Sequence, residues 1–88
     1  MLGTLTLPGA RGQVSLEDGE NVHTHELAGT TLQLDGRFVA RSEQPDAAAG
    51  RARLTATGDI RTVSYGTVVA DYGWSLPAAA AAAGRLQP

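Results

Sequence analysis

The sequence contains no cysteine and no lysine. Without cysteine the chain has neither a disulfide framework nor a thiolate zinc site, two devices that commonly stabilise small domains. The basic residues are seven arginines, set against nine acidic residues, which gives a formal net charge of −2. No basic stripe is present and aromatic residues are few, so base stacking has little support and we expect no nucleic-acid partner.

Large apolar side chains are also scarce. The chain has 88 residues, and its hydrophobic fraction of 42% includes fifteen alanines, six of them consecutive. A domain of this size buries only about 60% of its unfolded surface, so we expect a thin core that is helped by oligomerisation or by docking on a larger body. No run approaches the ~20 apolar residues of a membrane span. No charged start precedes an apolar run, so we expect a soluble protein without a signal peptide, cytoplasmic or virion-associated, with no membrane partner.

What is present is a pattern of period two. Apolar residues alternate with polar ones in short runs, which favours strands, and nine threonines agree with a half-buried sheet. Turn signals separate the runs at 8–12, Asp18-Gly19, Asp35-Gly36, 43–50, Gly58-Asp59 and Gly66. Asp35-Gly36 is the strongest hairpin signal. The pattern predicts an all-β fold, a small antiparallel sandwich or a jelly-roll-like barrel.

The last residues differ in composition from the rest. We therefore divide the chain into a β-domain, residues 1–74, and a C-terminal tail, residues 75–88. Pro77 suits the first turn of a helix and Gly84 suits its end, so Ala78–Ala83 is expected to form a short helix or an extended segment. Because such a short helix does not persist alone in water, we expect the tail to dock on another body.

His23 and His25 are the residues that most invite a chemical interpretation. Residues two apart in a strand share a face, so these imidazoles are candidate ligands for one divalent metal. A catalytic metal centre uses about three protein ligands, and the chain has no third histidine. The alternative is a solvent-facing strand whose histidines bind nothing and a protein with no cofactor.

Residues 14–74 resemble the cupin family of small jelly rolls. The resemblance rests on His23-Thr24-His25, on Gly36 at the spacing of the family's first motif, and on Gly58 and Gly66 at the glycine spacing of the second. It implies a jelly-roll fold, with His23 and His25 as metal ligands. The chain departs from the family at the remaining motif positions, where the family's Glu, Pro, His and Asn are replaced by Gly29, Ser64, Val69 and Gly73. The resemblance therefore implies the fold more than the family's metal chemistry.

Other catalytic devices are missing from the sequence, which has no nucleophile elbow, P-loop, dinucleotide fingerprint or calcium loop. The cluster of Glu17, Asp18 and Glu20 is expected to be a solvated turn. Tyr65, Tyr72 and Trp74 either fill the end of a barrel or form a docking patch, since Trp and Tyr are enriched at interfaces. As interface residues we predict Tyr72, Trp74, Leu76 and Leu86.

Two functions follow from these observations. The first is a non-catalytic structural or assembly protein that oligomerises or decorates a larger particle, such as a phage capsid. The capsid setting rests on analogy of size and composition. The second is a small cupin-like protein or enzyme that binds a metal or ligand through His23 and His25. We favour the first.

Overall fold

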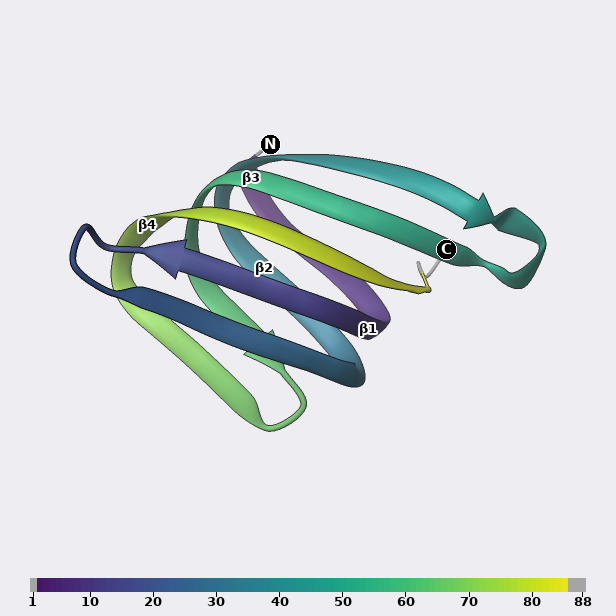
Figure 1. The fold of residues 1–88 in the computed structure, drawn as a ribbon, viewed down its shortest axis with the longest axis horizontal. Coiled ribbons are helices and arrows are strands. Elements are labelled where there is room, and N and C mark those ends of the chain that lie inside the picture. Colours follow the sequence, from purple (N-terminus) through teal and green to yellow (C-terminus); the bar gives the residue numbers. More distant parts are fainter. Residues whose placement is uncertain (1, 86–88) are drawn as a thin grey trace.

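The computed structural model describes residues 2–85, which form four long antiparallel strands closed into a barrel (Figure 1). Each strand pairs with the next along the chain, and pairing of the first with the last completes the barrel. The all-β prediction is confirmed, and the architecture is a four-stranded barrel. No helix in this range is long and apolar enough to cross a membrane. The elements are β1 (Leu2–Glu17), β2 (Val22–Asp46), the 3₁₀ turn η1 (Ala47–Ala49), β3 (Arg51–Tyr65) and β4 (Val68–Arg85).

The strands are long because the chain bends, and does not reverse its direction, at several positions where the sequence predicted turns. The ladders shift register between Leu7 and Ala10 in β1, and beside Arg61 in β3. Such bulges re-aim the side chains that follow them. In β1 the side chains that face the core accordingly change from an odd-numbered residue, Leu7, to even-numbered ones, Val14 and Leu16.

Of the six expected turns, two are correct, 43–50 is correct only over 47–50, where η1 and Gly50 connect β2 to β3, and three lie inside strands, among them 8–12 within β1. Asp18-Gly19 lies in the turn between β1 and β2, and Gly66 lies in the turn between β3 and β4. Asp35-Gly36 and Gly58-Asp59, in contrast, lie in the middle of β2 and β3, which pair with each other there. At Gly36 a Cβ would collide with the carbonyl oxygen of Asp59. Glycine is used here for the close approach of two backbones at a bend, and not for a turn.

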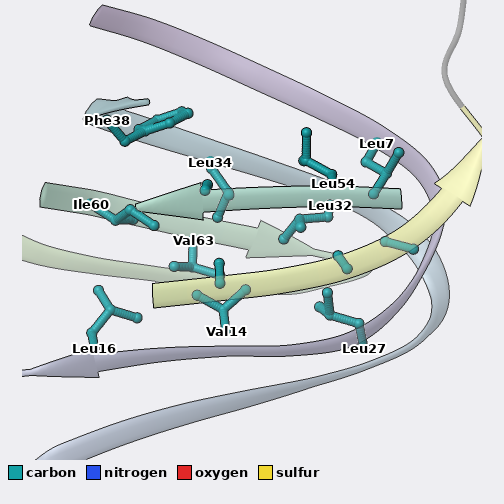
Figure 2. Packing of buried hydrophobic residues seen from close by; sticks show 14 of the residues in the cluster. Leu7, Val14, Leu16, Leu27, Leu32, Leu34, Phe38, Leu54, Ile60 and Val63 are labelled. Carbon is teal, nitrogen blue, oxygen red and sulfur yellow. The ribbon is translucent and has the colours of Figure 1, made fainter. Parts of the chain in front are cut away.

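The interior of the barrel is filled by apolar side chains from all four strands (Figure 2). Phe38 is the largest of the fully buried side chains, and the buried residues of the described chain are all apolar. The buried cluster comprises Leu7, Ala10, Val14, Leu16, Leu27, Leu32, Leu34, Phe38, Leu54, Ala56, Ile60, Val63, Leu76, Ala80 and Ala82.

The alanine-rich segment forms strand, so of the two expected forms of Ala78–Ala83 the extended one is found and the helix is not. These residues form the second half of β4, between β1 on one side and β3 on the other. Ala80 and Ala82 face the core, whereas Ala79, Ala81 and Ala83 are exposed. Two backbone ladders outweigh alanine's helix propensity, because a helix of six residues has little stability of its own. Residues 75–85, assigned above to a docking tail, thus belong to the barrel wall.

Candidate functional site

A cluster of histidine and tyrosine side chains lies between the first half of β2 and the start of β4. Across the described residues, no backbone ladder joins these two segments: residues 22–30 pair with β1, and residues 68–71 pair with β3. His23 and His25 come from β2, Tyr65 from the end of β3 and Tyr72 from β4. Both histidine rings contact the ring of Tyr72, so they share a face as the alternation predicts. Side chains here join two strand edges that backbone hydrogen bonds do not join.

His25 is at the centre of this cluster. Its Nδ1 lies 3.3 Å from the Tyr65 hydroxyl, and its Nε2 is hydrogen-bonded to the Tyr72 hydroxyl. A neutral imidazole has one donor and one acceptor nitrogen, so it donates to one phenol and accepts from the other. Burial lowers the pKa of His25, and the nearby His23 lowers it further. Burial also raises the pKa of Tyr72, with a smaller contribution from Tyr65. The environment therefore favours the neutral forms of His25 and Tyr72.

Asp18 links the histidine cluster to the turn between β1 and β2. Its Oδ1 accepts a hydrogen bond from the Asn21 amide at 2.7 Å, and its Oδ2 lies 3.1 Å from Nε2 of His23. The contact with His23, followed by the Asn21 amide, lowers the pKa of Asp18 from 3.8 to about 2. Asp18 is thus ionised at physiological pH. Its carboxylate fixes the conformation of the turn and holds the His23 ring.

The contacts of the two histidines bear on the metal hypothesis. Nε2 of His23 faces Asp18, and both ring nitrogens of His25 face tyrosine hydroxyls. Within residues 2–85, no three His, Asp or Glu side chains are grouped so that they could hold a metal ion. A divalent metal on His25 would have to displace one of its two tyrosine contacts, because both of its ring nitrogens are engaged. The metal assignment stays a prediction, and the geometry accounts for both histidines as links between strands.

Trp74 is presented to solvent on a bulge of β4. Ile60 pairs with Leu76 and Thr62 pairs with Asp71, so several residues of β4 lie opposite Arg61 alone. Within the bulge, Gly73 has a φ of +77° and its amide donates a 2.9 Å hydrogen bond to the Asp71 carboxylate. The Trp74 side chain is 70% exposed. An exposed tryptophan on a bulge with its own hydrogen bond is a strong candidate for a binding anchor.

An open cavity of about 580 Å³ lies beside Trp74. One wall is the β1–β2 turn, which contributes three carboxylates: Glu17, Asp18 and Glu20. The other wall is the segment 74–77 of β4. We call this region, Glu17–Asn21 with Trp74–Pro77, the Trp74 surface. It combines an aromatic ring with negative charge, the combination that recognises a cationic group.

The predicted interface residues lie in different environments. Trp74 is exposed, Tyr72 is half-buried in the histidine cluster, and Leu76 is 4% exposed and packs in the core. Leu86 lies outside the described residues. Their interface role stays a prediction. Sequence reasoning assigned no role to Asp18 beyond a solvated turn, and the only signal that pointed further was the sequence clustering of Glu17, Asp18 and Glu20.

Comparison of the chain with protein-family models, curated proteins and solved structures gives no match. The resemblance to cupins stays a prediction. The function of the chain is therefore inferred from its own geometry.

Proposed function

We propose that the protein is a non-catalytic binding module that docks on a larger protein assembly through the Trp74 surface. The observation that carries the proposal is the 70% exposure of Trp74 on a bulge beside an acidic turn. Large aromatic side chains dominate binding energy where they become buried in a complex. A phage capsid is the setting that the sequence predicts for such an assembly.

The partner that this surface fits carries arginine or lysine beside an apolar side chain. Glu17, Asp18 and Glu20 line one wall of the cavity, and the lowered pKa of Asp18 keeps that residue charged. A cation held between these carboxylates and the indole face gains both Coulomb attraction and a cation–π contact. Pro77, which is exposed and lines the cavity beside Trp74, supplies the apolar part of the contact.

A binding role also agrees with the way the reactive side chains are engaged. Both nitrogens of His25 contact tyrosine hydroxyls, and His23 contacts Asp18. The Tyr72 bond joins β2 to β4, the Tyr65 bond joins β2 to the end of β3, and the Asp18 contact joins β2 to the β1–β2 turn, so each contact connects separate parts of the fold.

The test uses two synthetic peptides of equal length, one alternating Arg with Leu and one alternating Glu with Leu. Calorimetric titration is expected to show binding of the Arg peptide only, and at least about tenfold weaker binding by Trp74→Ala, as expected for an aromatic anchor. Val69→Ala is the matched control, because Val69 is also 70% exposed but lies outside the cavity. Equal affinity of the two variants, or equal binding of the two peptides, would refute the proposal.

A further inference from the structure

A second cavity, of about 400 Å³, lies towards the η1 end of the barrel. The β1–β2 turn and the β2–β3 turn lie at opposite ends of the long axis, so this cavity and the Trp74 surface are separate (Figure 1). Four of its nine lining residues are arginines, and none is a carboxylate. The arginines are Arg11, Arg51, Arg53 and Arg85.

The sheet register places these arginines in two neighbouring rows. Arg53 pairs with Ala83 of β4, and Ala83 also pairs with Arg11 of β1, so two arginines flank one small alanine. Two positions further along the ladder, Arg51 pairs directly with Arg85. Like charges directly opposite each other destabilise a sheet. An anion between them would convert this repulsion into attraction.

Among the described residues, none of the nearby carboxylates forms an ion pair with the four arginines. Glu43 pairs in register with Arg53, and Asp46 with Arg51. Asp46 accepts a 3.2 Å hydrogen bond from the Ala49 amide and so holds the η1 turn. Glu26 is one row from Arg11. Across residues 2–85, the ion pairs within 4.0 Å join other side chains, His23 with Asp18 and Arg61 with Asp71.

We propose that this cavity binds an oligophosphate group of a small molecule. Arginine presents a planar fork of donors that matches phosphate oxygens two at a time, and it keeps its charge at all physiological pH values. Four such forks around one cavity favour a ligand with several negative charges. The volume lies near the lower limit for small-molecule sites, so it suits a compact group. Ala83 has a small side chain, and a Cβ added at Gly9 would meet no atom within 4 Å, so both leave space beside the arginines for phosphate oxygens.

Calorimetric titration with inorganic tripolyphosphate tests the proposal, in salt of about 0.15 M to screen non-specific attraction. The pocket variant Arg53→Gln/Arg85→Gln is expected to bind at least about tenfold more weakly than the wild type. The control Arg37→Gln/Arg61→Gln removes the same charge outside the cavity, and we expect its affinity to change less than about twofold. Arg53→Lys keeps the charge but loses the fork, so its affinity is expected to lie between those of the wild type and the pocket variant.

Three results would overturn the proposal. One is an absence of tripolyphosphate binding by the wild type, and another is equal weakening in the pocket and control variants. The third is binding of a single-stranded oligonucleotide without binding of tripolyphosphate, which would indicate a nucleic-acid surface instead. Circular dichroism of each variant establishes that it is folded. If the double variant does not fold, Arg53→Lys alone decides between the outcomes.

Discussion

Trp74 and Leu76 are two residues apart in β4, yet truncating Leu76 should lower the stability more than truncating Trp74. Leu76 is 4% exposed and packs in the core, so Leu76→Ala should lower the free energy of unfolding by about 2–5 kcal/mol. Trp74 is 70% exposed, so less than a third of its surface is covered. A fully buried tryptophan covers about 150–250 Å², so Trp74→Ala removes about 50–80 Å² of contact, or about 1–2 kcal/mol. Leu76 is thus the larger contributor to stability, and Trp74 is available for binding.

Urea unfolding followed by far-ultraviolet circular dichroism measures both changes. Fluorescence is unsuitable, because Trp74 is the sole tryptophan and one variant removes it. A domain of 88 residues is expected to have a total stability of about 4–13 kcal/mol, so the Leu76 variant should be close to unfolded or clearly weakened. If Trp74→Ala is as destabilising as Leu76→Ala, the indole is buried in solution. That result would refute the claim that Trp74 is exposed and available for binding.

Three further predictions concern the histidine cluster and the bends. Because the folded-state pKa of His25 is lowered, the unfolded chain binds more protons; stability should therefore fall as pH drops below 6.5, and His25→Gln should flatten this part of a melting-temperature profile. Tyr72→Phe removes a hydrogen bond to His25 and should cost about 0.5–1.5 kcal/mol in urea unfolding, whereas an unchanged stability would show that the bond is absent in solution. Gly36→Ala should cost more than about 1 kcal/mol and more than Gly3→Ala, whose positive φ is similar but whose Cβ would lie in open space; equal losses would contradict the close approach to Asp59.

The alternation of apolar residues was enough to predict an all-β fold, because sheet faces impose a period of two wherever one side is buried. It was not enough to separate bends from turns. Asp35-Gly36 has the composition of a hairpin turn, yet Gly36 meets the backbone of Asp59 across the sheet. Only the partner strand distinguishes these uses of glycine, and a single sequence does not contain that information.

The alanine-rich segment shows that local helix propensity is also not enough to predict the structure. Ala78–Ala83 favours helix in isolation, but in the barrel this segment lies between β1 and β3, whose backbones supply hydrogen-bond partners on both sides. Non-local pairing of this kind overrides local preference. At the candidate site, the shared face of His23 and His25 followed from the alternation, whereas their tyrosine partners did not, because Tyr65 and Tyr72 are 40 and 47 residues from His25.

The histidine cluster and the Trp74 surface are physically continuous. Asp18 contributes one carboxylate oxygen to His23 and the other to the turn that forms a wall of the cavity. Tyr72 bonds His25 and lies at the start of the bulge that presents Trp74. Because strands β2 and β4 lack a ladder here, these side chains set the spacing between the acidic turn and the indole. The polar residues that suggested a metal site thus also hold the proposed binding surface in place, as supporting side chains do in a preorganised site.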